Sequence, residues 1–410
     1  MSEAAPGKIV IVGGGQAALQ AIDTLRRRGY KGKLTCIAAE PELPYQRPPL
    51  SKSYLEGALD AARLALRGAA YFSERSVEVR TGMRAVSIDR DAQRVRLADG
   101  DSLEYDALLL ATGSQPRRLE TPGHSLEGVH LLRTRADADR LRGELGPGKR
   151  IVIVGGGFIG LEVAATARKL GLSATVLEMA DRVMGRIVCG EISAWFAALH
   201  ARHGVTLALN AQVAGFEDDG AGRVRAVRCA DGSVHPADVV LVGIGVIPSD
   251  ALARDCGLAC DNGITVDEHC RTNDPRIFAA GDCTDHPSRH YGRRLRLESV
   301  DNATEQGTSA ALNMLGIPTV HDKVPWFWSD QYEAKLIIIG LGLDHDASVM
   351  RGNPESGSFS MCYLKAGELV AVDTINNARD QMAARKLIAA HARPDATRLS
   401  DASRPMAECL

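Results

Sequence analysis

Two similar apolar runs stand out in the pattern of hydrophobic and polar positions along the chain. Residues 8–15 read KIVIVGGG and residues 150–157 read RIVIVGGG. Four β-branched residues followed by three glycines are typical of a buried parallel strand that ends in a tight turn. A segment with apolar residues at helical spacing follows the first run, at Leu19, Ile22 and Leu25. A strand, a turn and a helix are therefore predicted at both places.

The glycines after both runs fit a dinucleotide-binding fingerprint. The first copy has the form GxGxxA and the second GxGxxG, and each is followed by a second strand that ends beside an acid. Small residues let the backbone approach a pyrophosphate at a helix N-terminus, and the acid binds ribose hydroxyls. Two complete copies indicate two bound dinucleotides. The residues are Gly13, Gly15, Ala17, Ala18 and Glu40 in the first copy, and Gly155, Gly157, Gly160 and Glu178 in the second.

Two further apolar strands end in polar turns. DALLLATGS (106–114) breaks after Thr112, and TNDPRIFAAGDC (272–283) ends beside Asp282. An aspartate at such a strand end can hydrogen-bond the polyol part of a flavin nucleotide. The two dinucleotide sites therefore need not hold the same ligand.

The last quarter of the chain has a different pattern. From about residue 321 the runs KLIIIGLGL, SFSMCYL and LVAVDTI predict strands, and RDQMAARKLIAAHA predicts an amphipathic helix. Just before this region, residues 299–312 predict a helix that carries Asp301 in its first turn, where the acid could cap the helix.

Length and charge narrow the functional class. A chain of 410 residues is expected to form two or three domains. The formal net charge of −2 gives no reason to expect nucleic acid or an anionic membrane as partner. No apolar run approaches the roughly 20 residues of a membrane span. The first strand begins near Ile9, which leaves no room for a signal peptide, so a cytoplasmic location is expected.

The cysteines indicate neither disulfides nor a metal centre. There are nine, an odd number, and none form a CxxC pair, so reduced thiols are expected. A zinc site built from Cys256, Cys260, His269 and Cys270 is disfavoured, because structural zinc usually needs closely paired ligands. No metal is therefore predicted.

Together these motifs resemble the flavoproteins of the glutathione reductase fold, which have two dinucleotide-binding domains. In that fold the first domain binds FAD, and the second is inserted into it and binds the nicotinamide nucleotide. The resemblance implies an α/β fold with two Rossmann-like domains and a small C-terminal α+β domain. The expected ranges are 1–113 and 241–320 for FAD, 114–240 for NAD, and 321–410 for the C-terminal domain.

The stretch LPYQRPPLSKSYL (43–55) resembles the oxygenase-coupled ferredoxin reductases and apoptosis-inducing factor. No redox-active cysteine pair follows the first fingerprint, which disfavours disulfide and peroxide chemistry. The resemblance places Lys52 near the flavin, paired with Glu162, which would position the nicotinamide. It also assigns FAD contacts to Arg47, Arg117, Arg133, Ala85, Thr112, Asp282 and Val300, and nicotinamide contacts to Phe158, Ile159 and Gly245.

Glu178 is expected to select NADH as the donor. A carboxylate there accepts hydrogen bonds from the ribose 2′-hydroxyl and repels a 2′-phosphate. The nearby Arg182 and Arg186 weaken this expectation, because arginines can accommodate the phosphate.

The resemblance implies an FAD-dependent NADH:ferredoxin reductase that serves a [2Fe-2S] ferredoxin of a cytochrome P-450 monooxygenase or a ring-hydroxylating dioxygenase. Trp328 is a candidate for shaping the electron exit, and an aromatic core plug is the alternative. An acidic ferredoxin could dock on a basic hairpin, with Arg294 and Arg296 facing water, or the hairpin could simply be solvated. Its arginines are Arg289, Arg293, Arg294 and Arg296. Alternative functions are a rubredoxin reductase, an NADH oxidase and a signalling flavoprotein like apoptosis-inducing factor.

Overall fold

The computed structural model describes residues 5–410, and the chain divides into two compact units. Unit 1 contains the chain up to Gln46 with Ala61–Gln115 and Ile247–Lys323. Unit 2 contains Arg47–Asp60, Pro116–Val246 and Val324–Leu410. This division is coarser than the four ranges expected from the sequence, and each unit holds one of the two glycine-rich fingerprints.

A parallel sheet of order β20-β7-β1-β2-β3 forms the centre of unit 1. Its middle strand β1 (Lys8–Val12) is the first apolar run, and its last four residues are buried. Both faces of a parallel sheet are covered, which explains consecutive β-branched residues in place of alternation. The other strands are β2 (Lys33–Ile37), β3 (Val77–Arg80), β7 (Ala107–Leu110) and β20 (Ile277–Ala279).

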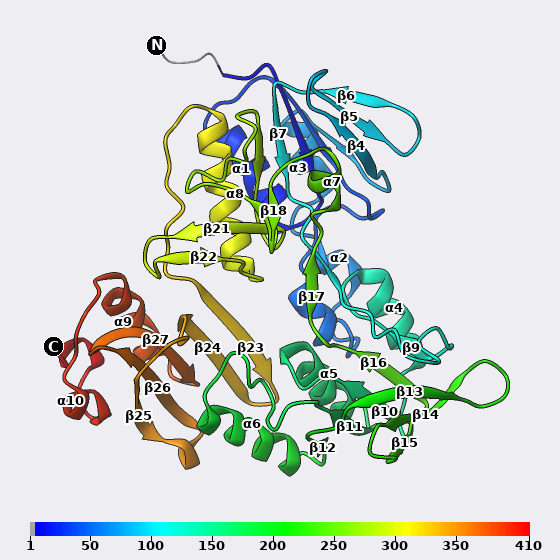
Figure 1. Ribbon diagram of the computed structural model, residues 1–410, viewed down its shortest axis with the longest axis vertical. Coiled ribbons are helices and arrows are strands. Elements are labelled where there is room, and N and C mark those ends of the chain that lie inside the picture. The colour runs from blue at the N-terminus through cyan, green and yellow to red at the C-terminus, as the bar shows by residue number, and fades with distance from the viewer. Residues whose placement is uncertain (1–4) are drawn as a thin grey trace. The chain divides into compact units, whose positions relative to one another are not determined.

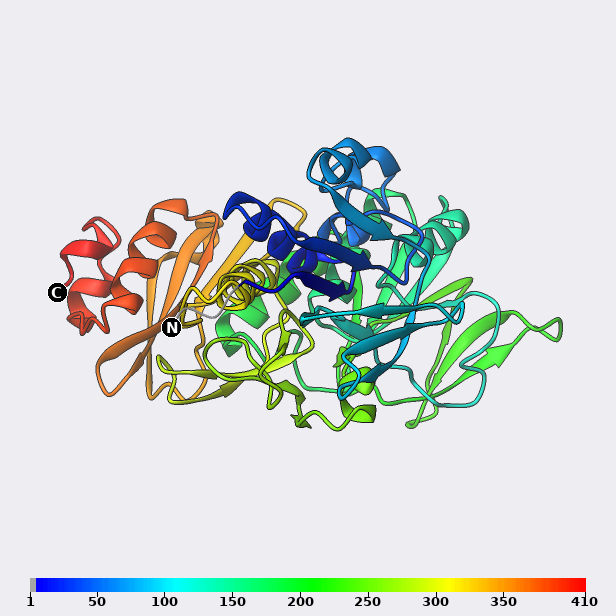
Figure 2. The same cartoon turned by 90° about the horizontal axis from the view of Figure 1, so that it is seen from above.

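Helices α1 (Gln16–Arg27) and α8 (Val300–Met314) lie side by side in unit 1 (Figure 1 and Figure 2). Their close approach depends on a missing side chain, since a Cβ on Gly307 would lie 2.5 Å from the carbonyl oxygen of Ala17. The two helices share one hydrophobic cluster with β1. The helix predicted over 299–312 is therefore present.

Unit 1 also contains shorter elements. Strands β4 to β6 form a small antiparallel sheet, and β18, β19, β21 and β22 form another sheet. The bounds are α2 (Ala61–Leu64), α3 (Ala69–Glu74), β4 (Ala85–Asp89), β5 (Arg94–Leu97), β6 (Ser102–Glu104), α7 (Ala251–Asp255), β18 (Cys260–Asp261), β19 (Gly263–Thr265), β21 (Thr284–Ser288) and β22 (Arg293–Leu295). Strands β8 (Ser114–Pro116) and β17 (Val246–Pro248) each span a boundary between the units.

Unit 2 repeats the parallel arrangement in the order β12-β11-β10-β16-β9. The second apolar run forms its middle strand β10 (Arg150–Val154), which leads into helix α5 (Phe158–Lys169). A Cβ on Gly160 would lie 2.1 Å from the carbonyl oxygen of Gly155, so only glycine lets the helix pack this closely. The other strands are β9 (Val129–His130), β11 (Ser173–Leu177), β12 (Thr206–Ala208) and β16 (Val239–Val242).

An antiparallel sheet of order β23-β24-β27-β26-β25 forms the C-terminal part of unit 2. Helices α9 and α10 lie against it (Figure 1). Leu336 and Ile338 point to one hydrophobic cluster and Ile337 and Ile339 to another, so both faces are covered. The bounds are β23 (Trp326–Gln331), β24 (Ala334–Gly340), β25 (Ala347–Asn353), β26 (Ser358–Lys365), β27 (Glu368–Ile375), α9 (Ala378–Ala389) and α10 (Ala396–Ser400).

The remaining elements of unit 2 surround these two sheets. A three-stranded antiparallel sheet joins β13, β14 and β15. The bounds are η1 (Pro48–Ser51), α4 (Arg135–Glu144), α6 (Gly190–Arg202), β13 (Val213–Asp218), β14 (Val224–Cys229), β15 (Val234–Pro236), η2 (Pro354–Ser356) and η3 (Met406–Glu408), where η marks a 3₁₀ helix. Among residues 5–410, none of the helices has the length and apolar character needed to cross a membrane.

A buried ion pair ties the chain's last segment to the C-terminal sheet, and its loss should destabilise unit 2. Arg351 donates to Asp380 over 2.9 Å with both side chains at most 3% exposed, and it also donates to the carbonyl oxygens of Leu399, Asp401 and Arg404. Arg351→Leu leaves Asp380 buried and unpaired, so we expect a loss of about 3–5 kcal/mol in the free energy of unfolding.

Urea unfolding followed by tryptophan fluorescence measures this loss, because all three tryptophans lie in unit 2. The exposed neighbour Arg379 provides the control variant Arg379→Leu, which should change stability by less than about 1 kcal/mol. Equal stabilities of the two variants would contradict the role of the pair.

Candidate dinucleotide and ion-pair sites

The turns after β1 and β10 can be made only by glycine. Gly13 has φ +132° and Gly155 has φ +108°, both in the left-handed half of backbone space. A Cβ would lie 2.0 Å from the carbonyl oxygen of Ala111 at Gly13, and 2.5 Å from that of Gly243 at Gly155. Each strand can therefore turn directly into its helix.

Both helices begin with open N-termini. Gly15 caps α1 and Gly157 caps α5, and neither helix has a side chain that hydrogen-bonds its first N–H groups. A Cβ on either glycine would meet nothing within 4 Å. Unsatisfied N–H groups facing open space suit an anion, so both positions fit the pyrophosphates of FAD and of a nicotinamide dinucleotide.

The predicted ribose-binding acids follow the second strand of each fingerprint. Half-buried Glu40 lies beyond β2 and accepts a hydrogen bond from the Tyr45 hydroxyl. Glu178 lies directly after β11, and its carboxylate accepts from the backbone N–H groups of Gly156 at 2.7 Å and Ala180 at 2.8 Å. Glu178 is thus fixed against the glycine turn, as the fingerprint requires.

In unit 1 the segment that follows β7 (residues 111–114) lies beside the segment that follows β20 (residues 280–283). The Ser114 hydroxyl donates to Asp282 over 2.8 Å, and Thr112 donates to the carbonyl oxygen of Ser249 over 2.6 Å. Buried Gln306 of α8 accepts from the N–H of Gly281 at 2.7 Å and so holds the turn that carries Asp282. The strand ends predicted to share a ligand are therefore neighbours.

The thiols of Cys36 and Cys283, close to the glycine turn and to Asp282, are unsuited to redox chemistry. Burial raises the pKa of Cys36 to about 12, and burial also raises the pKa of Cys283. Both are therefore protonated thiols at neutral pH. None of the nine cysteines is in a disulfide, and no cluster of potential metal ligands occurs within residues 5–410.

Lys52 and Glu162 form the predicted ion pair within unit 2. Lys52 Nζ lies 2.6 Å from Glu162 Oε2, and the exposed fractions of the side chains are 21% and 3%. The Ser51 hydroxyl donates to the same oxygen over 2.5 Å, and the Ser329 hydroxyl donates to Oε1 over 2.7 Å. A nearly dry carboxylate is therefore met by one cation and two hydroxyl donors.

Helix α5 also fixes the segment that carries Lys52. Thr166, one turn after Glu162, donates to the carbonyl oxygen of Ser51 over 2.9 Å. Arg47, just before η1, donates to the carbonyl oxygen of Arg133 over 2.8 Å. Lys52, Glu162, Arg47 and Arg133 are thus held in one part of the fold that includes α5, η1 and the segment before α4.

The other predicted nicotinamide contacts all lie in unit 2. Phe158 and Ile159 form the start of α5, and Gly245 precedes β17. Ile159 is 45% exposed, whereas Phe158 packs on Phe327 with ring centroids 4.7 Å apart. The backbone N–H of Arg117 donates to the carbonyl oxygen of Gly245 over 2.9 Å. Ile159 is available to a ligand, and Phe158 has a packing role as well.

In unit 1 the predicted flavin contacts Ala85 and Val300 are half-buried, at the starts of β4 and α8. The cap of α8 differs from the expectation: Ser299 accepts from the N–H of Asn302, and Asp301 lies in the first turn without being the N-cap. Ser299 was available to cap because it directly precedes the helix.

Trp328 lies in β23, half-buried against a hydrophobic cluster of the C-terminal sheet. Its ring centroid is 5.4 Å from that of Trp326. This position agrees with the core-packing alternative, and a role in electron exit stays a prediction.

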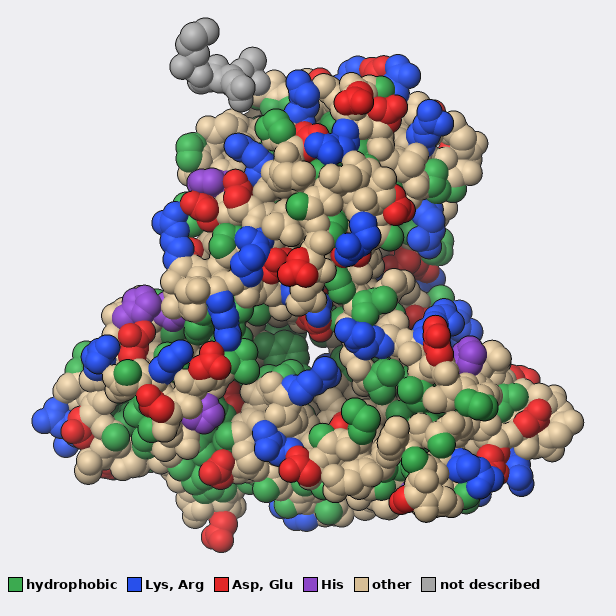
Figure 3. All heavy atoms as spheres, viewed as in Figure 1, with side chains coloured by type: hydrophobic (Ala, Val, Ile, Leu, Met, Phe, Trp, Pro, Cys, Tyr) green, Lys and Arg blue, Asp and Glu red, His purple; other side chains and the backbone are tan. Residues whose placement is uncertain are grey.

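Acidic side chains neutralise much of the basic hairpin. Arg289 pairs with Glu268, Arg294 with Asp285 and Arg296 with Glu298. The prediction that Arg296 faces water is wrong, since its side chain is only 12% exposed, while that of Arg294 is 42% exposed. Arg296 also donates to Asn262, which folds it onto the protein. Figure 3 shows the same mixture of charges, with basic and acidic side chains interspersed over the face drawn.

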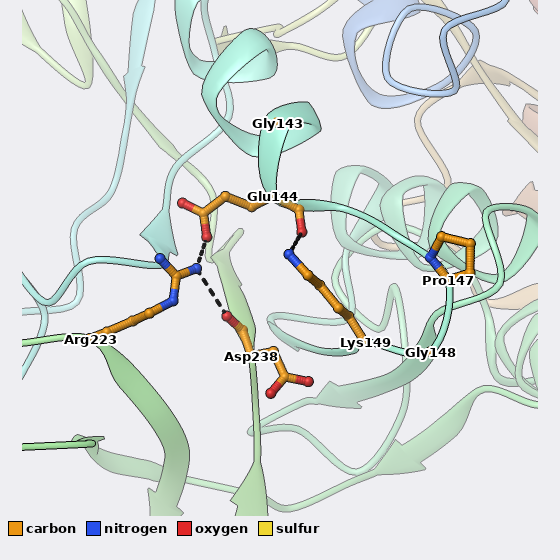
Figure 4. A pocket seen from close by; sticks show the side chains of 7 residues that line it. All are labelled: Gly143, Glu144, Pro147, Gly148, Lys149, Arg223 and Asp238. Carbon is orange, nitrogen blue, oxygen red and sulfur yellow. Dashed lines mark hydrogen bonds and ion pairs between the residues drawn. The ribbon is translucent and has the colours of Figure 1, made fainter. Parts of the chain in front are cut away.

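A polar depression in unit 2 lies away from the fingerprint. It is lined by Glu144, Lys149, Arg223 and Asp238, among others, at the amino end of β10 (Figure 4). Ligands of parallel sheets bind at the carboxyl ends of the strands. The charged groups here already have partners within the protein, since Arg223 pairs with Glu144 and Lys149 donates to the backbone carbonyl oxygen of Glu144. This depression is therefore not a dinucleotide site.

Sequence reasoning missed Ser51, Ser329, Ser114 and Gln306. Ser51 adjoins Lys52, so its place beside the pair had a local signal. Ser329 and Gln306 act on groups that are distant along the chain, and no spacing in the sequence indicates this.

Two family models match the chain. The model described as pyridine nucleotide-disulphide oxidoreductase matches residues 7–307, and the one described as reductase C-terminal matches residues 326–410.

Known proteins resemble the chain over nearly its whole length. It is 46% identical to the rhodocoxin reductase of Rhodococcus erythropolis over 93% of this chain and 89% of that protein. It is 44% identical to the ferredoxin–NAD(+) reductase component of the anthranilate 1,2-dioxygenase system of Burkholderia cepacia, over 96% of each. The reductase in the crystal structure of the covalent putidaredoxin reductase–putidaredoxin complex matches with a TM-score of 0.95 and 39% identity, over 98% of each chain.

The fold, the paired fingerprints and these matches agree. The chain belongs to the pyridine nucleotide-disulphide oxidoreductase family, in its group of oxygenase-coupled ferredoxin reductases.

Proposed function

We propose that this protein is an FAD-dependent NADH:ferredoxin reductase. Its partner in this proposal is a [2Fe-2S] ferredoxin that serves a cytochrome P-450 monooxygenase or a ring-hydroxylating dioxygenase in the cytoplasm. The observation that carries the proposal is the presence of an open helix N-terminus behind a glycine turn in each unit, at Gly15 and Gly157. The relatives, named as reductases of rhodocoxin, of putidaredoxin and of a dioxygenase system, support the acceptor class.

The chemistry explains why two dinucleotides are needed. Nicotinamide transfers electrons in pairs and an iron–sulfur cluster accepts one, and bound FAD supplies the conversion between the two. The residues proposed to hold FAD in unit 1 are Gly13, Gly15, Ala17, Glu40, Ala85, Thr112, Asp282 and Val300. Glu178, Gly157 and Ile159 hold NADH, and Glu162 positions its carboxamide. The protonated thiols of Cys36 and Cys283 support electron transfer without a cysteine intermediate.

Lys52→Met should slow the reduction of bound flavin by NADH about 10- to 100-fold. The variant keeps the length of the side chain but removes the cation from the buried carboxylate, so reactant alignment suffers. Stopped-flow absorbance at the flavin band measures the rate. Lys169→Met removes an exposed lysine paired with Glu56 and is the matched control. Reduction of the Lys52 variant at the wild-type rate would refute the assigned role.

Glu178→Gln should reduce the preference for NADH over NADPH by roughly tenfold. The change removes the charge that repels a 2′-phosphate and weakens the hydrogen bond to the ribose. The measurement is the ratio of kcat/KM for the two donors. Glu191→Gln, at an exposed position on α6, serves as the control. An unchanged ratio would mean that selection depends on other residues, such as Arg182 or Arg186.

Added two-iron ferredoxin should stimulate NADH-dependent cytochrome c reduction several-fold, and salt should reduce this stimulation. The proposed docking surface is the part of the hairpin that carries Arg289, Arg293 and Arg294, without the 12% exposed Arg296. Arg289→Glu with Arg293→Glu should weaken the ferredoxin-dependent rate and leave flavin reduction by NADH unchanged. The control Arg379→Glu, at an exposed position, should change neither rate.

If rubredoxin stimulates NADH-dependent cytochrome c reduction and ferredoxin does not, the rubredoxin reductase alternative replaces this proposal. Rapid NADH oxidation by oxygen alone favours an NADH oxidase. Dimerisation on addition of NADH, without acceptor reduction, favours the signalling alternative.

A further inference from the structure

A chain of buried polar side chains continues from the Lys52–Glu162 pair into the interior of unit 2. Ser329 and Gln331 are two apart on β23, so their side chains lie on the same face of the strand. Gln331 Nε2 lies 3.1 Å from Ser329 Oγ, and Gln331 Oε1 lies 2.8 Å from His200 Nε2 on α6. Ser329, Gln331 and His200 are all fully buried.

The charge on Glu162 fixes the direction of every hydrogen bond in this chain. A carboxylate only accepts, so the single proton of the Ser329 hydroxyl points to Glu162 Oε1. Ser329 Oγ then faces Gln331 with its lone pairs, and Gln331 must present its NH₂ group there. The amide oxygen of Gln331 therefore faces His200, which must carry its proton on Nε2.

The surroundings of His200 agree with this assignment. Its Nδ1 is buried and has no hydrogen-bond partner within the described chain, so a proton on Nδ1 would leave a buried N–H group without an acceptor. Burial lowers the pKa of His200, so the ring is neutral at neutral pH. Tyr332 contacts the ring edge to face, with centroids 5.2 Å apart, and holds its orientation.

We infer that Ser329, Gln331 and His200 are positioning residues that orient the Glu162 carboxylate, which in turn positions the nicotinamide of NADH. This inference rests on the proposed function, in which Glu162 positions the nicotinamide. Donors aligned in one direction polarise one another and strengthen the bond that ends on the carboxylate. Without Ser329, Oε1 has no remaining donor among the residues described here, and the carboxylate is free to rotate about its two bonds to Ser51 and Lys52.

The kinetic test uses Ser329→Ala and Gln331→Met. The limiting rate of flavin reduction at saturating NADH should fall about 10- to 100-fold in Ser329→Ala and by less in Gln331→Met, because alignment is lost. The NADH concentration at half-maximal rate should change much less, since the contacts to ribose and pyrophosphate remain. Ser360→Ala is the matched control. Ser360 lies in β26 of the same sheet, is also buried and donates to a buried carboxylate, that of Asp380 on α9, and its variant should keep the wild-type rate.

Nitrogen-15 NMR of the histidine side chains in the flavin-loaded protein gives a readout that does not depend on activity. The resonance of His200, assigned with His200→Gln, should report a neutral ring protonated at Nε2. It should shift in Ser329→Ala and stay unchanged in Ser360→Ala. A proton on Nδ1 in the wild type would contradict the direction of the chain.

The rates separate this inference from the function on which it rests. Slow reduction in Lys52→Met with wild-type limiting rates in both Ser329→Ala and Gln331→Met would overturn the positioning role and leave the proposed function intact. Wild-type rates in Lys52→Met as well would overturn the role of the ion pair, and the positioning role with it.

Discussion

Glu162 places a carboxylate inside unit 2 with only 3% of its side chain exposed, and a charge in that position must be matched by donors. The donors come from two chain segments that are far from Glu162 in sequence: the turn at 51–52 and strand β23. Helix α5, the 3₁₀ turn η1 and the C-terminal sheet therefore meet at this carboxylate. Removal of any one donor leaves part of a buried charge unsatisfied. The same donors therefore stabilise the local fold and hold the Glu162 carboxylate in place.

A second constraint acts on the backbone and operates twice. Each fingerprint needs a glycine at positive φ, because a side chain would collide with the carbonyl oxygen of a neighbouring strand end. Glycine makes this turn without strain, and the turn leads into a helix whose first N–H groups face open space. The duplication of the apolar run thus reflects one physical solution to anion binding that is used in both units.

Much of the fold could be predicted because its signals are local. The runs before Gly13 and Gly155 indicate buried parallel strands, and the acids at Glu40 and Glu178 follow at the expected spacing. The hydrogen-bond chain from Glu162 to His200 could not be predicted, since it joins α5, β23 and α6 through contacts that no spacing encodes. Arg296 was predicted to face water from strand alternation, yet its bonds to Glu298 and Asn262 hold it against the surface. Alternation gives the face of a strand but not the partners of a long side chain.

The central claim is that electrons enter in pairs from NADH and leave singly to an iron–sulfur protein. An anaerobic titration tests it most directly: the flavin-loaded protein, in catalytic amount, is mixed with excess oxidised two-iron ferredoxin, and NADH is added in limiting portions while both chromophores are followed. The account predicts two ferredoxin molecules reduced for each NADH consumed. Consumption of NADH while the ferredoxin stays oxidised would contradict it.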